Sequence, residues 1–303
     1  MTTVQVILSS YNGEKYIREQ LESILAQKGV EIRLLIRDDG STDGTRSILS
    51  EYEQRFRNIT VIYGTNVGVI QSFFLLLKQA GDYPYLAFAD QDDVWLEQKL
   101  KQAMDKITKK EKEIVGPIVY CSAKQLVDDA LCPLPSPITY PKVRTAFGNA
   151  LVENMCTGCT CVINREMVQL LRGRIPKFAV MHDFWIYLVG TCFGSVIYDE
   201  ESYILYRQHG TNKLGAATSL WENYKRRIKN FKKHRGQLTR QAEELWNLYQ
   251  KIMPEEHRKL TEEFVQSKKH WKLRKKLVQE RTIFRQRKSD DCIMKLLFFC
   301  GLL

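Results

Sequence analysis

Short apolar runs alternate with segments of helical periodicity over the first 110 residues of the chain. Short, mainly apolar runs predict four strands, at residues 4–9, 31–37, 59–63 and 85–89, and the first of them is rich in β-branched residues. Apolar residues at helical spacing predict four helices, at residues 14–27, from the cap residues 41–43 to residue 52, at 69–79 and at 97–110. Strands that alternate with helices indicate an α/β fold with a mainly parallel, Rossmann-like sheet.

Beyond residue 111 the alternation becomes less regular. Apolar runs predict strands at residues 118–123, 155–164, 195–198 and 204–206, and helical spacing predicts helices at residues 165–171 and 181–189. Four prolines between residues 133 and 141 predict an extended loop. From residue 220 to residue 289 the pattern is helical and basic.

Two acidic clusters come directly after predicted strands. Asp38 and Asp39 end the second strand, and residues 90–93 (DQDD) end the fourth. Ligands of open parallel sheets bind beyond the carboxyl ends of the strands, so both clusters are expected at the ligand-binding edge. Carboxylates two positions apart, such as Asp90 and Asp92, suit Mg²⁺, which is commonly held by one or two carboxylates and substrate phosphates.

Several other kinds of site are excluded because their spacing is missing. The chain has no G-x-G-x-x-G after the first strand, no G-x-x-x-x-G-K-[ST] and no G-x-S-x-G. A calcium loop that starts at Asp39 fails, because Ser50 stands where a bidentate Glu is required. Cys156, Cys159 and Cys161 lack the second Cys or His pair of a zinc site, and we interpret them as small buried residues of a strand.

Composition adds an asymmetry of charge to this picture. The chain has 303 residues, 44% of them hydrophobic, which fits two domains or one large domain with an appendage. The net charge of +11 comes from residues 221–289, which hold 21 Lys and Arg against 8 Asp and Glu, whereas the rest holds 25 against 27. No run of 18 apolar residues predicts a membrane-spanning helix, and the first residues do not have the pattern of a signal peptide.

The basic segment admits three interpretations. Aromatic residues are interleaved with its lysines and arginines, and the apolar residues 292–303 that follow are too few to span a bilayer. We favour attachment to an anionic membrane surface, since a basic helical segment with an apolar end suits the inner leaflet. The alternatives are packing on the body or an oligomer contact, and nucleic-acid binding, for which no recognised motif is present.

Six motifs in order along the chain carry a family likeness. They are Ser9-Ser10-Tyr11-Asn12-Gly13, residues 38–45 (DDGSTDGT), residues 66–68 (NVG), residues 90–95 (DQDDVW), residues 182–185 (HDFW) and residues 206–212 (YRQHGTN). In this combination the chain resembles the inverting family-2 glycosyltransferases with a GT-A fold. Within them it is similar to the bacterial rhamnosyltransferase branch, which builds cell-wall and capsular polysaccharide.

The resemblance covers about residues 1–215 and implies a division of the chain. It places a nucleotide-sugar-binding half at residues 1–110 and an acceptor-binding half of the same GT-A domain at 111–215. Residues 216–303 would be a basic, mainly helical C-terminal segment.

The resemblance also implies donor-binding residues in the first half. Ser9 and Tyr11 would contact the nucleotide base, and Asp39 would recognise the pyrimidine. Asn66 and Gly68 would shape the donor pocket, although a plain turn is an equal interpretation for both.

The remaining implied roles concern the reacting groups. Asp90 would face the ribose and Asp92 would hold a divalent cation, Mg²⁺ or Mn²⁺. Asp183 would be the general base, because a carboxylate at a helix N-terminus is electrostatically favoured and stays ionised; a helix cap is the alternative. His209 would contact the diphosphate or complete the metal shell, with a structural role as its alternative.

Together these roles imply an inverting, metal-dependent transfer of rhamnose from dTDP-L-rhamnose to a lipid-linked saccharide acceptor at the cytoplasmic face of the cell membrane. A UDP-hexose or UDP-N-acetylhexosamine donor is the alternative, because the base-contacting residues do not separate uracil from thymine. A glycosidase, and a non-catalytic protein that binds nucleic acid or nucleotide, rank lower. The resemblance implies no nucleic-acid partner, and it leaves an oligomer through the C-terminal segment open.

Overall fold

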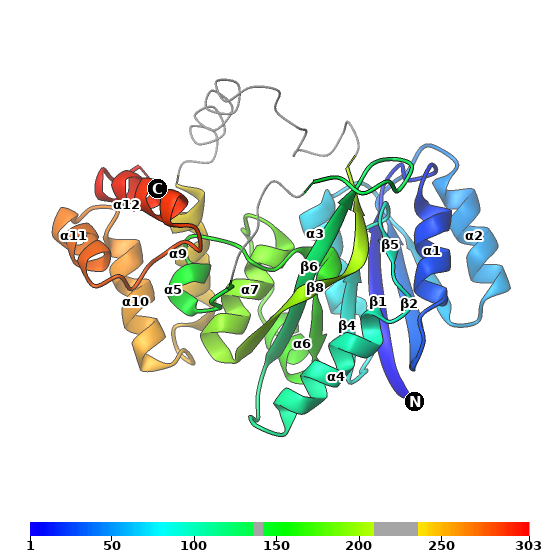
Figure 1. The fold of residues 1–303 in the computed structure, drawn as a ribbon, viewed down its shortest axis with the longest axis horizontal. Helices are drawn as coiled ribbons and strands as arrows, with labels where there is room; N and C mark the ends of the chain where they lie inside the picture. Colours follow the sequence, from blue (N-terminus) through cyan, green and yellow to red (C-terminus); the bar gives the residue numbers. More distant parts are fainter. Residues whose placement is uncertain (136–141, 209–235, 303) are drawn as a thin grey trace.

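A computed structural model describes residues 1–135, 142–208 and 236–302. One sheet of eight strands runs through the middle of the molecule, in the order β3-β2-β1-β4-β7-β6-β8-β5 (Figure 1). The first four of these strands are parallel to one another. Their carboxyl ends therefore meet at one edge of the sheet, as the alternation of strands and helices predicts.

The first half of the chain builds the parallel part. Its strands are β1 (Thr2–Ser10), β2 (Val30–Asp38), β3 (Ile59–Tyr63) and β4 (Tyr85–Ala89). Its helices are α1 (Ile17–Leu25), α2 (Thr45–Arg55), α3 (Val69–Gln79) and α4 (Lys99–Glu111). The short strand β5 (Val94–Trp95) was not predicted, and it pairs with the distant strand β8.

The second half adds strands of mixed direction. Its elements are β6 (Ile118–Val127), α5 (Phe147–Ala150), the 3₁₀ turn η1 (Gly158–Thr160), β7 (Val162–Asn164), α6 (Arg165–Arg172), α7 (His182–Phe193) and β8 (Ser195–Arg207). Strand β7 is antiparallel to both β4 and β6, whereas β6 and β8 are parallel to each other. Strand β7 thus joins the parallel part to the second half.

Two of the predicted strand assignments are wrong in this half. The strand predicted at residues 155–164 begins only at Val162, because Gly158–Thr160 forms a 3₁₀ turn. The buried cysteines Cys156, Cys159 and Cys161 therefore precede the strand. The two strands predicted at residues 195–198 and 204–206 are one continuous strand, β8.

Both faces of the sheet are covered by helices, because alternate residues of each buried strand point to opposite sides. Val4, Val6 and Leu8 of β1 belong to a core with α1, α2 and α4, whereas Ile7 belongs to a core with α3, α6 and α7. The result is a three-layer α/β/α arrangement, which leaves the strand ends free for a ligand site.

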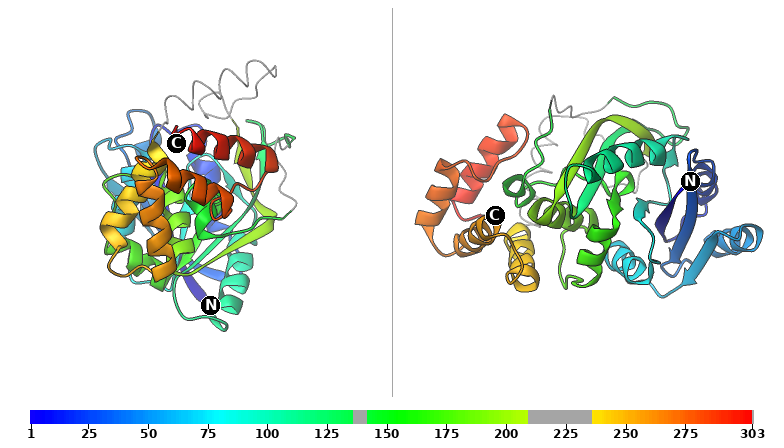
Figure 2. Two further views of the ribbon diagram at one scale, coloured as in Figure 1. Left: turned by 90° about the vertical axis from the view of Figure 1, so that its left-hand side faces the viewer. Right: turned by 90° about the horizontal axis from the view of Figure 1, so that it is seen from below.

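Within residues 236–302 four helices follow the sheet, and Figure 2 shows them grouped away from α1 and α2. They are α9 (Gln237–Tyr249), α10 (Glu255–Gln266), α11 (Trp271–Gln279) and α12 (Lys288–Phe299). Tyr249 is buried against Trp185 of α7, with ring centroids 6.3 Å apart, and His257 Nδ1 lies 2.8 Å from the Cys192 carbonyl oxygen. The helices therefore share one continuous core with the body.

Helix α12 is buried on one side only. Met294 and Phe298 face the core, whereas Ile293, Leu296 and Phe299 are 50%, 64% and 47% exposed. These three residues lie three positions apart, so they form an apolar stripe on one side of the helix. Among the described residues, no helix is both long enough and apolar enough to pass through a lipid bilayer.

Candidate active site

Loops from four strands are tied together at the carboxyl edge of the sheet. Gln91, in the loop after β4, accepts hydrogen bonds from Ser10 Oγ (3.0 Å) and Tyr11 N (2.8 Å) in the loop after β1. Asn12 Oδ1 accepts from Thr42 N (2.8 Å) in the loop after β2. These hydrogen bonds fix the relative positions of the predicted motifs.

Asp39 is buried and supports the loop that follows β3. Its carboxylate forms an ion pair with Arg37, and it accepts hydrogen bonds from the backbone N–H groups of Val67 (2.9 Å) and Gly68 (2.8 Å). Gly40 approaches the same loop so closely that a Cβ there would lie 2.9 Å from Asn66 N. Asp39 therefore positions Asn66 and Gly68 directly, in addition to the role in pyrimidine recognition implied by the resemblance.

Asp38 has a structural position at the end of β2. Its carboxylate is fully buried. It accepts hydrogen bonds from Gly40 N, from Ser41 N and from Arg46 Nε (2.7 Å). These contacts form the turn that follows β2 and anchor helix α2.

Arg207, the last residue of β8, holds the acidic loop after β4 in place through hydrogen bonds. The N–H of Arg207 donates to Asp93 Oδ1 (3.2 Å), and its Nε donates to the Asp92 carbonyl (2.9 Å). The guanidinium is buried and also pairs with Glu19. Arg207 belongs to the predicted motif at residues 206–212, but its position under the acidic loop was not predicted.

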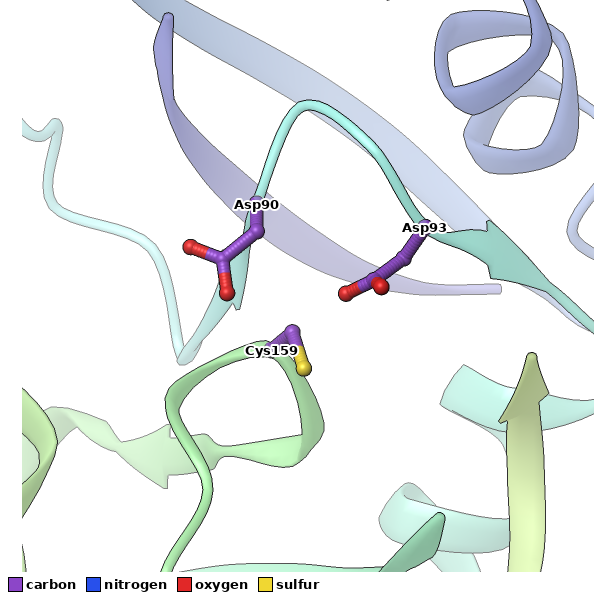
Figure 3. Close-up of side chains that lie close together, drawn as sticks. All are labelled: Asp90, Asp93 and Cys159. Atoms are coloured by element: carbon purple, nitrogen blue, oxygen red, sulfur yellow. The ribbon is translucent and has the colours of Figure 1, made fainter. Parts of the chain in front are cut away.

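Asp90, Asp93 and Cys159 form a compact group, and Figure 3 shows their side chains turned toward one another. One ligand atom from each lies within 4.8 Å of the other two. Burial raises the pKa of Asp93 to about 7, with the Asp92 carboxylate as the next cause. Burial also holds the pKa of Asp90 well above its usual range. The pKa is raised further by the nearby carboxylates of Asp93, Asp92 and Asp183.

These residues fit a divalent cation. Carboxylates this close are ionised together only when positive charge compensates them. Asp93 Oδ2 is buried and has no hydrogen-bond partner in residues 1–135, 142–208 and 236–302. Asp92 was the predicted metal ligand; it lies in the same loop, while the group of closest ligand atoms contains Asp90 and Asp93 instead.

Asp183 is the second residue of α7 and lies close enough to Asp90 to influence its pKa. Asp183 Oδ2 accepts a hydrogen bond from Gly158 N (2.9 Å), and Oδ1 accepts one from Phe184 N (2.6 Å). The carboxylate therefore binds an N–H group in the first turn of α7 and also lies near Asp90, so a structural role and the predicted role as base are compatible.

His182 is part of the packing rather than a polar group of the site. Its ring stacks on Phe73, with centroids 4.0 Å apart, and neither ring nitrogen has a hydrogen-bond partner among the residues described. Burial lowers its pKa, so the ring is neutral at physiological pH. A Cβ on Gly158 would lie 2.7 Å from His182 Nε2, and this contact requires glycine at position 158.

Lys124 of β6 is a cation of the site that the sequence pattern did not indicate. Its Nζ donates to Thr157 Oγ1 (3.2 Å) and lies 4.2 Å from the centre of the Tyr206 ring. Its charge opposes the effect of burial and of the neighbouring acids on the pKa of Asp90 and Asp93, so the ammonium lies near both. The only signal in the sequence was one lysine inside a mostly apolar strand.

The remaining predicted residues line the same edge. Ser9 Oγ donates to Ser72 Oγ (2.6 Å), whereas Tyr11 is 46% exposed and extends from the loop after β1. Gly68 has φ = +82°, which favours glycine at the start of α3. The predicted metal or diphosphate contact, His209, lies outside the described residues.

The fold and the acid-lined edge define a nucleotide-sugar transferase of the GT-A type. In a comparison with solved structures, the chain is similar to S. aureus TarS 1–349 in complex with UDP-GlcNAc, with a TM-score of 0.60 and 21% identity. The match covers 88% of this chain and 72% of that chain.

Comparison with protein families gives the narrower assignment. The family model described as glycosyl transferase family 2 matches residues 5–171, and the chain belongs to this family. It is 32% identical over 235 residues to dTDP-rhamnosyl transferase RfbG of Shigella flexneri, covering 72% of this chain and 77% of the relative. It is also 30% identical over 229 residues to TuaG of Bacillus subtilis, a glycosyltransferase named for teichuronic acid biosynthesis, covering 73% of this chain and 87% of the relative.

Proposed function

We propose that the chain is an inverting glycosyltransferase that moves rhamnose from dTDP-L-rhamnose to a saccharide acceptor of a cell-surface polysaccharide. The observation that supports the proposal is that the Asp183 carboxylate lies near enough to Asp90 to raise its pKa, while Asp90 shares its loop with Asp92 and Asp93. A donor diphosphate held at the loop would present its anomeric carbon to an acceptor hydroxyl at Asp183.

The reaction is a single displacement, in which Asp183 accepts the proton of the acceptor hydroxyl. The hydroxyl oxygen forms the new bond to the anomeric carbon while the bond from that carbon to the diphosphate breaks, and the configuration inverts. The hydrogen bonds from Gly158 N and Phe184 N keep the carboxylate of Asp183 oriented.

The leaving diphosphate requires positive charge. Bound Mg²⁺ or Mn²⁺ would neutralise the charge that develops on the leaving oxygens. Asp92, Asp90 and Asp93 are the residues that would hold the ion. Lys124 adds a fixed ammonium on the same side, where it stabilises the diphosphate as it departs.

The name of the relative RfbG supports rhamnose as the sugar and thymine as the base. A UDP-hexose or UDP-N-acetylhexosamine donor is the second candidate, because TarS was solved with UDP-GlcNAc and shares the fold. The name of TuaG supports a role in the synthesis of a cell-wall polysaccharide. A lipid-linked acceptor and a peripheral position of the chain on the inner membrane face are further parts of the proposal. The division at residues 110 and 215 into donor half, acceptor half and C-terminal segment remains part of this proposal.

A donor panel with the purified full chain tests the function. We expect nucleoside diphosphate release with dTDP-L-rhamnose plus acceptor, its loss in EDTA and its recovery with Mg²⁺ or Mn²⁺. Asp183→Asn keeps an oxygen for the Gly158 bond but cannot accept the proton, so kcat should fall by about 10²–10⁴-fold with donor affinity retained. Asp92→Asn should weaken both metal response and turnover. Full activity of Asp183→Asn would overturn the assignment of the base.

A further inference from the structure

We propose that Asp90, Asp93 and Cys159 form a mixed carboxylate–thiol pocket that binds a thiophilic dication such as Co²⁺, Zn²⁺ or Cd²⁺. The three side chains come from the loop after β4 and from η1, and they point toward one another (Figure 3). Their ligand atoms lie within 4.8 Å of one another. A ligand set of two carboxylates and one thiol differs from a set of carboxylates alone in the metals that it prefers.

The pocket contains a buried oxygen without a partner. Asp93 is 1% exposed, and its Oδ2 has no hydrogen-bond partner within the described part of the chain. An unpaired buried acceptor costs stability, and a cation at this place would satisfy it. Cys159 is fully buried, and its thiol interacts with the side chain of Asp93.

The spacing is close to that of a coordination shell. Zinc-like dications hold sulfur at about 2.3 Å and carboxylate oxygen at about 2.0–2.2 Å, so ligand atoms of one tetrahedral shell lie about 3.4–3.6 Å apart. Side-chain movements of about 1 Å would close the group around an ion. Three protein ligands leave a position open for a diphosphate oxygen.

The thiol sets the preference among metals. Mg²⁺ takes oxygen ligands, whereas a cysteine ligand favours softer ions. On binding, the sulfur–metal bond replaces the S–H bond of Cys159, and the proton leaves to the buffer. The inference deepens the proposed function, because the same loop would hold the leaving diphosphate.

Cys156 provides a matched control in a neighbouring group of thiols. Cys121, Cys156 and Cys161 are all fully or almost fully buried, and Cys156 interacts with the other two thiols. The group of side chains that could hold a cation contains Cys159 but does not contain Cys156. A serine at either position makes the same chemical change in a buried thiol.

Titration of the full chain with Co²⁺ tests the pocket. We expect a sulfur-to-cobalt charge-transfer band in the near ultraviolet, lost in Cys159→Ser with at least a tenfold weaker affinity for Co²⁺, and retained in Cys156→Ser. Asp93→Asn should also weaken Co²⁺ binding about tenfold. If Cys159→Ser does not fold, this second variant still tests the pocket, because it keeps all the thiols.

Absence of the band in the wild type, or its persistence in Cys159→Ser, would overturn the inference. Loss of the band in Cys156→Ser alone would place the cobalt at the other thiols and would overturn it as well. Sugar transfer with Mg²⁺ by the wild type tests the proposed function separately, so the two failures are distinguishable.

Discussion

Lys99 is a fully buried lysine just behind the acidic loop. Its ammonium lies 3.6 Å from the centre of the Trp95 ring and has no hydrogen-bond partner in the described residues. Burial lowers its pKa from 10.5 to about 8. Burial of the charged ammonium therefore lowers the stability of the fold. The contact with the Trp95 ring and the nearby acidic groups offset this cost only in part.

Lys99→Met should stabilise the protein at neutral pH, by on the order of 2 kcal/mol, because methionine removes the buried charge and keeps the length of the chain. The unfolded chain binds the Lys99 proton more tightly than the folded one, so the free energy of unfolding of the wild type should rise as the pH increases from about 8 to about 10.5. Urea denaturation at several pH values measures both effects.

The control is Lys101→Met, two residues along the same helix, where the side chain is exposed and paired with Asp105. This variant should show neither the gain nor the change of pH dependence. A Lys99→Met variant that is less stable than the wild type at pH 7 would contradict the assignment of a destabilising charge.

At the scale of single elements, the start of helix α3 depends on Asp39 rather than on its own residues. No side chain caps α3, and the loop before it is held by the bonds from Val67 N and Gly68 N to Asp39. Asp39 also neutralises Arg37, which is buried. The motif at residues 38–45 therefore supports the fold, in addition to the nucleotide contact that we propose for it.

Asp39→Ala should lower the free energy of unfolding by about 3–5 kcal/mol, because it leaves the buried guanidinium of Arg37 without its partner. Tyr11→Ala, at an exposed donor-site residue, should change stability by less than about 0.5 kcal/mol while it raises the KM for the donor. Denaturant titration and donor kinetics of both variants check this ordering. Equal stability of the two variants would mean that Asp39 serves the ligand alone.

The elements of the parallel half were predictable because local signals agree there. The strands at residues 59–63 and 85–89 and the helix at 69–79 have the predicted bounds, each run being flanked by Gly, Pro or polar residues. At residues 155–161 the sequence is rich in Cys and Thr and resembles a strand, but Gly158–Thr160 forms a 3₁₀ turn, and Gly158 N donates to the side chain of Asp183. That bond joins residues far apart in the sequence, and no local pattern contains it.

The same reasoning applies to the site. The acidic loops were predictable because parallel strands bring their carboxyl ends together. Cys159 and Lys124 enter through η1 and β6, and β7 joins this region to β4 by antiparallel pairing. Spacing along the chain does not predict such a non-local arrangement.

At the scale of the whole molecule, the C-terminal helices are attached to the body but not fully covered. Their inner residues belong to the core that reaches from α3 to α12. Residues 267–302 hold 11 Lys and Arg against 3 Asp and Glu, and α12 exposes its apolar stripe of Ile293, Leu296 and Phe299. An apolar stripe in a basic segment complements an anionic bilayer surface, where both features contribute to binding.

Replacing Ile293, Leu296 and Phe299 together by serine should weaken binding to vesicles that contain anionic lipid by about 100-fold, at about 1 kcal/mol for each side chain partly inserted. Binding of the wild type should fall with added salt and with neutral lipid, because the lysines and arginines supply the electrostatic part. Val115→Ser, which removes a fully exposed apolar side chain elsewhere, is the matched control and should bind as the wild type does. Unchanged vesicle binding by the triple variant, together with a dimeric wild type and a monomeric variant, would instead identify the stripe as a contact between two copies of the chain.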